Sequence, residues 1–471
     1  MRRHRATVLT ATLLCLGALG SAGAAPAFAE APHTSQAPRA APAAHGSAIS
    51  TPSPHTDPVA ALERAAHPLR STEPSGPSSD LRPLGRVVGD AKVVGLGEAT
   101  HGSHEFFAMK HRVFRYLVEH RGFRTFALEA PWSTGLRLNA YVLRGEGDPR
   151  RIMREEFQDA YRFWNNDEYL SLLRWMRAYN AAHPKDPVQF MGDDFGYAGP
   201  ELYDRVTDYV REAHPALLPE FTELYRGLRP TTDVRAYMTA YMAKPLGERR
   251  EMAARTRRAL DLLSARRPGA GPAERARFAW AVRHATALDQ TAQQYAFDFA
   301  DPTGVRDAML FRDRAMADNT AWWQRQTGDR VLLSAHNAHV SYESYDAASY
   351  PRMQGAFLRD RLGSDYVSVG FTFDRGSFKA TDPEGKAIST HTVGPAAPGS
   401  NEHTLDRVRH RDYVVDLRSA PPAARAWLAT PRPTRAIGTS YPEPDRSLAL
   451  TPSHDVLIHL REIRAAELLP E

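Results

Sequence analysis

Short apolar runs that end in charged residues alternate with helical patterns along this chain, and this alternation limits the fold. Four runs are the clearest: AKVVGLGE at 91–98, FRTFALEAP at 123–131, VQFMGDD at 188–194 and DRVLLSAH at 329–336. Apolar strands separated by helices are typical of a parallel sheet that is covered on both faces. We therefore expect an α/β fold with a mostly parallel central sheet flanked by helices.

The rest of the chain predicts further strands and a large helical region. Later strand candidates are 366–374, 412–417, 434–440 and 454–460. Residues from about 197 to 328 have no convincing strand pattern, and amphipathic stretches such as ELYDRVTDYVREA predict helices there. We expect an all-helical insertion at 197–328 that covers the strand ends. Whether the segment after about Asp374 completes the sheet or forms a separate layer stays open.

The N-terminal segment has the pattern of a secretory signal peptide. Residues 1–29 combine three early arginines with a short apolar run and an Ala-x-Ala site ending at Ala29. The run is shorter than a comfortable membrane span. Residues 30–58 are rich in Ala, Pro and Ser and nearly lack large apolar side chains, which predicts a disordered linker. We expect a secreted, extracellular protein with one folded domain at 59–471 and no stable membrane insertion after cleavage.

Composition excludes several classes of function. The net charge is +5, and removing the three arginines of the signal peptide lowers it to +2, so no nucleic-acid partner is expected. Cys15 is the only cysteine and lies in the expected signal peptide, so the mature chain has no disulfide, thiol nucleophile or thiolate metal site. There is no GxSxG elbow, Walker A motif or convincing GxGxxG fingerprint. A hydrolase of this sequence would use activated water.

Titratable residues gather where the predicted strands end, which is where ligands bind in such sheets. In GLGEATHGSHE, Glu98 and His101 lie three residues apart after a strand, and Ser103 is a candidate N-cap of the next helix. A neutral imidazole can accept a proton from water while a carboxylate holds its tautomer. The cluster predicts acid–base catalysis, and a structural loop histidine is the alternative.

Lys110 is expected to face the core. Phenylalanines and a valine lie three and four residues away on either side, so they share its helix face. A buried ammonium is costly without an acid partner, and Glu98, Glu105 or Glu129 could supply one. The alternative is that the long side chain of Lys110 reaches water past the phenylalanines.

Three other strand ends carry titratable groups. Glu129 could orient a histidine or pair with a cation, and Asp194 adds an acid, although either could instead have a cap, loop or ion-pair role. His336 and His339 would point to opposite faces of a strand but could converge on a turn. Zinc sites draw on three or four ligands, and enough His and Glu are present to build one. A metal-dependent hydrolase therefore stays an alternative.

These motifs resemble those of the erythromycin esterases. The similarity rests on GLGEATHGSHEFFAMKHRVFRYLVE, TFALEAPW, RDAMLFRDRAMADN and VLLSAHNAHVS, which follow the family's order from about Val93 to Val340. The resemblance implies an α/β protein with a helical region that opens a macrolide lactone ester. It also implies a histidine that activates water without a covalent intermediate.

The resemblance carries the family's general base onto His101 and its acid onto Glu98. Further motif positions fall on Glu105, Glu129, His336 and His339. Antibiotic-resistance esterases of the family have Arg where this chain has Lys110. Lys lacks the planar fork that grips a carboxylate, which leaves the substrate open.

Together these observations predict a secreted carboxylic ester hydrolase. The predicted catalytic residues are His101, Glu98, Glu129 and His336, and the predicted substrate-binding or charge-stabilising residues are Glu105, Lys110, His339 and Asp194. His336, with Lys110 nearby, would stabilise the oxyanion or protonate the leaving alkoxide. The expected partner is a small-molecule ester or macrolactone, with no cofactor and no metal. A binding protein that holds a macrocycle without turnover is a third interpretation, and no oligomeric state is indicated.

Overall fold

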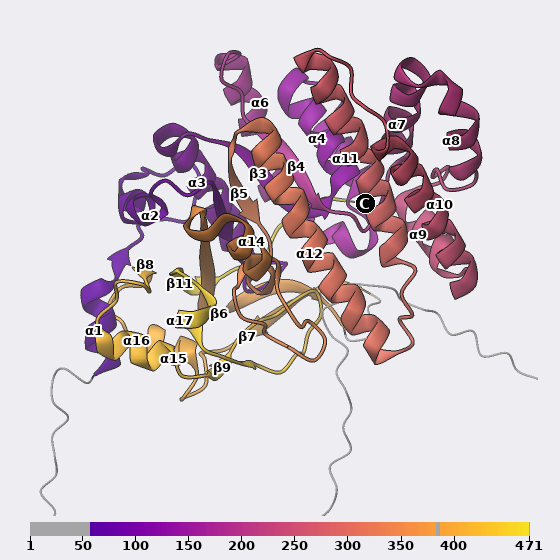
Figure 1. Cartoon of the computed structure of the whole chain (residues 1–471). Helices are drawn as coiled ribbons and strands as arrows, with labels where there is room; N and C mark the ends of the chain where they lie inside the picture. The colour runs from indigo at the N-terminus through magenta and orange to yellow at the C-terminus, as the bar shows by residue number, and fades with distance from the viewer. Residues whose placement is uncertain (1–56, 383–386, 471) are drawn as a thin grey trace, which may run out of the picture.

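The computed structural model describes residues 57–382 and 387–470. The expected signal peptide at 1–29 and nearly all of the expected linker at 30–58 lie outside these residues. The described chain forms a mixed α/β fold in which helices flank a central sheet, as expected (Figure 1).

The central sheet of the described residues has nine strands in the order β1-β8-β11-β6-β2-β5-β3-β4, with β7 paired to β6. They are β1 (His67–Pro68), β2 (Val93–Leu96), β3 (Phe123–Pro131), β4 (Gln189–Asp194), β5 (Arg330–Ser334), β6 (Tyr366–Thr381), β7 (Ile388–Val393), β8 (Asp412–Asp416) and β11 (Val456–Ile463). The neighbours from β11 to β4 are parallel, whereas β1, β7 and β8 pair antiparallel. The C-terminal segment therefore completes the sheet through β8 and β11. It also adds a separate hairpin of β9 (Arg432–Thr434) and β10 (Arg446–Leu448).

Alternation of side chains along the strands produces two cores. In β2, Val94 and Leu96 join one core, whereas Val93 joins the other. In β5, Leu332 joins the first core and Leu333 the second. Because successive side chains of a strand point to opposite faces, a sheet covered on both faces needs apolar residues at every position. This is why these strands are continuous apolar runs.

Helices cover both cores. The first core includes α2 (Arg82–Val88), α3 (His104–Arg121), α4 (Trp132–Arg144), α5 (Pro149–Glu156), the 3-10 helix η2 (Asp159–Trp164) and α6 (Asp167–Ala182). The second core includes α7 (Pro200–Ala213), α8 (Leu218–Leu224), α9 (Val234–Met242), α10 (Leu246–Ser264), α11 (Pro272–Gln294), α12 (Pro302–Thr327) and α14 (Gln354–Leu362). A smaller cluster beside β8 is formed by α1 (Pro58–Ala65), α15 (Asn401–Leu405), α16 (Pro422–Leu428) and α17 (Leu450–Ser453).

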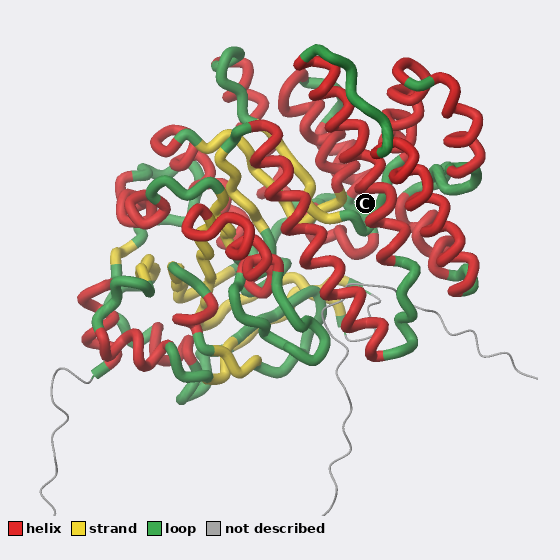
Figure 2. The backbone as a smooth tube through the Cα atoms, in the orientation of Figure 1, coloured by secondary structure: helices red, strands yellow, loops and turns green. Residues whose placement is uncertain are grey.

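The chain between β4 and β5 contains helices and loops and no strand among its residues, all of which the structure describes. Helices α7 to α11 gather on the right of Figures 1 and 2, beside the strands. The long α12 then returns across the molecule and packs against β4 and β5. This path brings the last helix of the segment close to the strand ends.

The expected strand at 434–440 is not formed: Thr434 is the last residue of β9, and residues 435–440 belong to the loop that follows it. The Ile437 N–H donates to the Ala99 carbonyl at 2.8 Å, and the Thr439 carbonyl accepts from the Thr381 N–H at 2.8 Å. Because these bonds go to two different segments, no ladder with a single neighbour forms. The loop is instead bound by hydrogen bonds to Ala99, which follows β2, and to Thr381 at the end of β6.

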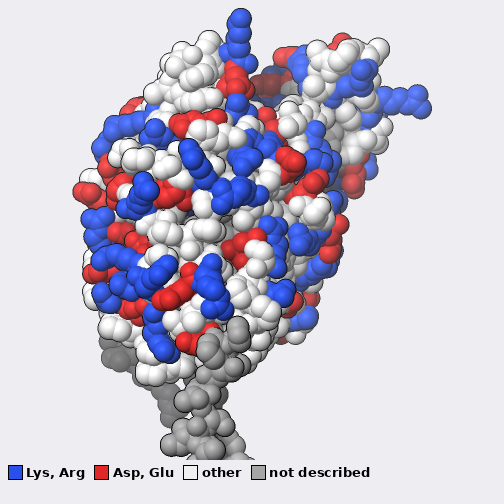
Figure 3. Space-filling view, turned by 90° about the vertical axis from the view of Figure 1, so that its left-hand side faces the viewer, with Lys and Arg blue, Asp and Glu red and all other residues white. Residues whose placement is uncertain are grey.

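The surface shows mixed charge. On the face seen in Figure 3, Lys and Arg side chains are interspersed with Asp and Glu, with uncharged residues between them. Within residues 57–382 and 387–470, no helix is long and apolar enough to cross a membrane.

Candidate active site

The neighbouring strands β2, β5, β3 and β4 end at the same edge of the sheet and bring the predicted charged residues together. Glu98 follows β2 and His336 follows β5, while Glu129 and Asp194 lie at the ends of β3 and β4. All four residues are buried, with at most 7% of their surface exposed. Parallel strands place their carboxyl ends on one side, so residues far apart in the sequence meet there.

Glu98 connects His101 to Lys110. One Glu98 oxygen accepts a hydrogen bond from His101 Nδ1 at 2.7 Å, and the other accepts from Lys110 Nζ. Lys110 also donates to the Ala335 carbonyl at 3.2 Å. Burial lowers the pKa of Lys110, and the Glu98 carboxylate opposes that shift. Of the three acids considered for Lys110, the structure therefore pairs it with Glu98, which also holds His101 with its proton on Nδ1.

Two glycines let the backbone around His101 pack closely. A Cβ atom on Gly97 would lie 2.1 Å from Asn337 Oδ1, and one on Gly102 would lie 2.0 Å from the Lys379 carbonyl oxygen. Lys379 also donates its N–H to the Gly102 carbonyl at 2.8 Å. The His101 loop is therefore held directly against β6, with no room for a larger residue.

His336 uses both of its ring nitrogens in hydrogen bonds. It is the N-cap of α13 (Asn337–Val340), where Nδ1 accepts from the Ala338 N–H at 3.2 Å and Nε2 donates to the Ile437 carbonyl at 3.2 Å. Burial and the nearby His101 lower the pKa of His336 well below its ordinary value. The ring is therefore neutral, and both of its nitrogens are occupied by hydrogen bonds within the protein. These two hydrogen bonds favour a positioning role for His336, and its role as oxyanion stabiliser or proton donor stays a prediction.

Arg312 joins two of the strand-end carboxylates. From α12, Nη2 donates to Glu129 Oε1 at 3.0 Å and to Asp194 Oδ2 at 2.7 Å, and Nε donates to Asp194 at 3.2 Å. The Tyr161 hydroxyl also donates to Asp194, at 2.8 Å. Arg312 and Tyr161 are absent from the residues that the sequence predicts. The only signal for Arg312 is its place in the motif RDAMLFRDRAMADN.

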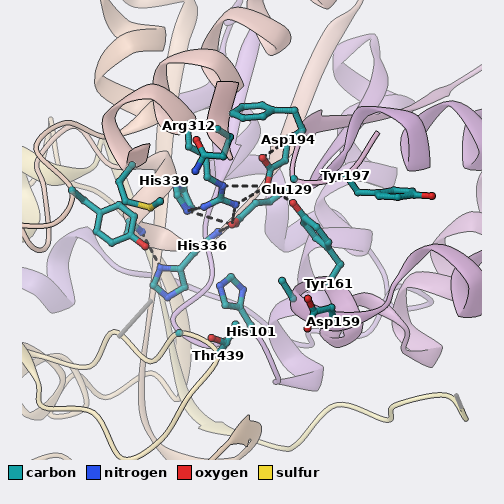
Figure 4. Close-up of a pocket in the computed structure, with 18 of the residues that line it drawn as sticks. His101, Glu129, Asp159, Tyr161, Asp194, Tyr197, Arg312, His336, His339 and Thr439 are labelled. Atoms are coloured by element: carbon teal, nitrogen blue, oxygen red, sulfur yellow. Dashed lines mark hydrogen bonds and ion pairs between the residues drawn. The ribbon is translucent and has the colours of Figure 1, made fainter. Parts of the chain in front are cut away.

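His339 lies beside Arg312. Its Nδ1 donates to Asp313 Oδ1 at 2.8 Å, and its Nε2 lies 3.2 Å from Arg312 Nη1, which can only donate, and 3.3 Å from Glu129 Oε1. Burial acts to lower the pKa of His339, but Asp313 and Glu129 raise it to about 10. Burial likewise acts to raise the pKa of Glu129, but His339 and Arg312 lower it well below the ordinary value. Glu129 therefore stays ionised beside Arg312 and His339 (Figure 4).

The charged groups line one wall of a cavity of about 760 Å³. His101, Glu129, Asp194, Arg312, His336 and His339 border it, and Figure 4 shows them around a common space. Apolar and aromatic side chains form much of the remaining wall, including Tyr161, Trp164, Phe195, Tyr197, Val234, Met238, Met242, Tyr295, Val305, Met309 and Met353. Helices α9 and α12 of the helical segment therefore help to enclose the site.

Three predicted residues near His101 lie outside the cavity wall. Lys110 and Glu105 do not line the cavity. Lys110 lies behind Glu98, and Glu105 accepts hydrogen bonds from Arg464 N at 2.6 Å and Nε at 2.7 Å. Neither residue borders the cavity, and of the two roles predicted for Lys110 its ion pair with Glu98 favours charge stabilisation. Ser103 is the N-cap of α3 by position, but its hydroxyl makes no capping hydrogen bond.

In the described part of the chain, no group of three or more His, Cys, Asp and Glu side chains is arranged to hold a metal ion. Glu129 and Asp194 already bind Arg312, and His336 uses both ring nitrogens.

The fold and the site define an α/β protein that holds a histidine–carboxylate pair beside a largely apolar cavity. The model of the erythromycin esterase family matches residues 118–463. The chain belongs to the erythromycin esterase family, and this membership supports its assignment as an esterase-type hydrolase acting on a small molecule. The matched range begins within α3, after the His101 loop.

The chain is similar to a characterised relative and to solved structures. The chain is 26% identical over 375 residues to erythromycin esterase type II of Escherichia coli. The matched residues cover 75% of this chain and 87% of that protein. A solved structure of a succinoglycan biosynthesis protein is similar at 31% identity with a TM-score of 0.77, over 88% of this chain and 99% of that chain. A histidine-to-asparagine mutant of the erythromycin esterase EreC in its open conformation shares the fold, at 18% identity and a TM-score of 0.64, over 83% of this chain and 96% of that chain.

Proposed function

We propose that this protein hydrolyses an ester or lactone of a macrolide-like compound with water activated by His101 and without a covalent intermediate. The proposal rests on the hydrogen bonding of the two ring nitrogens of His101. Its Nδ1 is held by Glu98 at 2.7 Å, whereas Nε2 has no hydrogen-bond partner among the described residues. His101 also borders the cavity. An imidazole with one nitrogen fixed and the other open is arranged to remove a proton from water.

Attack of water on an ester carbonyl creates an oxyanion that needs positive charge. Arg312 borders the same cavity as His101 and supplies that charge, and His339, whose pKa is raised by Asp313 and Glu129, borders the cavity beside it. Glu129 and Asp194 fix the Arg312 guanidinium through hydrogen bonds of 3.0 and 2.7 Å. In this proposal the oxyanion role passes from His336 and Lys110 to Arg312 and His339.

The cavity and the relatives support a macrolide-like substrate. A volume of about 760 Å³ with many apolar lining residues suits a large apolar ligand. The Escherichia coli relative is itself named as an erythromycin esterase. The absence of a GxSxG elbow from the sequence supports direct attack by water rather than a serine nucleophile.

Mass spectrometry of the products tests the proposal. The full chain is incubated with a panel of macrolides and simple esters, beside a His101→Asn control. We expect one substrate to gain one water at its ester, and the control to leave it intact. Saturable binding with no change in ligand mass would instead indicate a binding protein. Activity lost on chelation and restored by zinc would indicate a metal-dependent hydrolase.

We also propose that the enzyme is secreted, on the basis of the arginines, the apolar run and the Ala-x-Ala site within residues 1–29. Expression in a secreting host followed by N-terminal sequencing tests this proposal. A mature chain in the medium that begins near Glu30 is expected, whereas an uncleaved chain retained in the cytoplasm would contradict it.

A further inference from the structure

Hydrolysis of an alkyl ester needs a proton for the leaving oxygen as well as a base for the attacking water. His336 cannot supply this proton without losing its hydrogen bond to Ile437. His339 is held at Nδ1 by Asp313, and its Nε2 lies 3.2 Å from Arg312 Nη1 and 3.3 Å from Glu129 Oε1. Both histidines are engaged, which leaves two kinds of proton donor: the His101 imidazolium formed during the attack, or a separate acid that borders the cavity.

We propose that Glu443, on the loop between β9 and β10, is the general acid that protonates the leaving oxygen of the ester. This inference rests on the proposed function and adds a catalytic residue to it. The loop is the segment whose first half was expected to be a strand.

The structure holds this loop against the His101 site. Glu443 lines the same cavity as His101. On the N-terminal side of Glu443, Ile437 is bound through its N–H to the Ala99 carbonyl and through its carbonyl to His336. Further along, the Tyr441 N–H donates to β6 at 2.9 Å. These contacts fix the loop before Glu443 on the residues that border the base.

The Glu443 carboxyl is only partly engaged. Glu443 Oε1 accepts from Ser440 Oγ at 2.8 Å, and no other hydrogen bond or ion pair of this carboxyl is formed with the described residues. Burial raises the pKa of Glu443, although Ser440, Arg446 and His101 act to lower it. The charged or titratable groups that face it are His101, Tyr350 and Arg446, and Arg446 itself pairs with Asp346. Burial shifts this carboxyl toward its protonated form, and when protonated its open oxygen can donate a proton into the cavity.

The other carboxyls of the cavity are less suited. Glu129 and Asp194 bind Arg312, and Asp346 pairs with Arg446 at 3.4 Å. Asp159 also has a pKa raised by burial, but the charges that act on it are Arg162 and Arg235, and not His101. Figure 4 places Asp159 beside Tyr161. Asp159 is therefore the matched control for Glu443.

The proposed reaction is balanced with one water. His101 Nε2 takes one proton of the water as its oxygen bonds to the carbonyl carbon, and the carbonyl oxygen becomes the oxyanion. The oxyanion then re-forms the C=O bond and the C–O bond of the ester breaks, while Glu443 gives its proton to the leaving oxygen. The products are a carboxylic acid and an alcohol. A proton passes from the His101 imidazolium through solvent to the Glu443 carboxylate and restores both groups.

Leaving-group dependence tests this role. A 4-nitrophenyl ester expels a stable phenolate that needs no proton, whereas an alkyl ester of the same acid does need one. We expect Glu443→Gln to lower kcat for the alkyl ester about 10²-fold while the nitrophenyl ester keeps a rate near that of the wild type. Asp159→Asn should change both esters by the same factor. An equal effect of Glu443→Gln on both esters, or no effect on either, would overturn the assignment.

Ser440→Ala gives a second readout that keeps Glu443 in place. Removing the hydroxyl that donates to the carboxylate should raise the pKa of Glu443 and move the alkaline limb of alkyl-ester hydrolysis to higher pH. An alkaline limb at the same pH in Ser440→Ala and the wild type would contradict the role of Glu443 as general acid. If the wild type hydrolyses no ester, the proposed function itself fails. If the wild type hydrolyses both esters and these variants lack the expected effects, only the assignment of Glu443 fails.

Discussion

Glu98 and Lys110 form an ion pair that is closed to solvent. Both residues have 0% exposure, and the second Glu98 oxygen binds His101 at 2.7 Å. A buried charge without its partner is costly, so each member depends on the other. The acid that orients the proposed base is therefore also the acid that keeps a cation in the core.

We expect Lys110→Met to lower the free energy of unfolding by about 3–5 kcal/mol, because it leaves the Glu98 carboxylate buried without its cation. Lys110→Arg keeps the charge, so its loss should be smaller. Urea unfolding of both variants checks this prediction. Equal stability of Lys110→Met and the wild type would show that the ion pair does not support the fold.

Arg312→Met removes the cation that joins Glu129 to Asp194. We expect kcat to fall about 10²–10³-fold, as on removal of a group that stabilises an oxyanion. Arg314→Met is the matched control, because Arg314 lies on the same helix, is exposed and does not line the cavity. Steady-state kinetics of both variants on one ester compare them. A similar kcat for the two would remove Arg312 from the mechanism.

His339 makes stability depend on pH. Its pKa is about 10 in the folded protein against an ordinary value of 6.5. Because the folded value is raised, its stabilisation is complete below about pH 6.5 and is lost as the pH rises to about 10. We expect His339→Gln to show a smaller loss of unfolding free energy over this window than the wild type. Denaturant titrations at about pH 6.5, 8 and 10 measure it.

His104 provides the comparison for that experiment. Hydrogen bonds to Glu168 and Glu73 raise its pKa to about 9, so its stabilisation is lost in the same direction. His104→Gln should also reduce the loss of unfolding free energy as the pH rises. The loss that comes from deprotonation of His339 should remain in this variant. An unchanged slope for His339→Gln would mean that His339 is not charged in the folded protein.

Gly102→Ala should displace the His101 loop. The new Cβ would lie 2.0 Å from the Lys379 backbone oxygen, which cannot move without shifting β6. We expect lower kcat and a lower Tm. Gly247→Ala is the control, because nothing lies within 4 Å of its Cβ position in α10 and alanine favours a helix by about 0.5–1 kcal/mol. Equal effects of the two substitutions would contradict the close packing.

Much of the site can be predicted because it depends on local pattern. The apolar runs before Glu98, Glu129 and Asp194 identify buried strands, and the geometry of a parallel sheet then brings their ends together. The helical spacing around Lys110 predicts that it faces the core, and Lys110 is buried on α3. These features need no knowledge of which distant segments touch.

Other parts of the site depend on such contacts and could not be predicted. Arg312 lies on a long helix with several other arginines, and only the path of α12 across β4 selects it. Segment 434–440 has apolar residues that favour a strand, but its hydrogen bonds go to two different neighbours. The two nitrogens of His336 are engaged by Ala338 and by this same loop. The sequence alone therefore does not show that His336 lacks a free proton.

The kcat of His101→Asn tests the central claim most directly. The variant and the wild type are compared on an ester that the wild type hydrolyses, at matched folding by Tm and circular dichroism. If His101 activates water, kcat should fall about 10²–10⁴-fold while the variant stays folded and still binds the ester. A folded His101→Asn variant with the kcat of the wild type would contradict the mechanism.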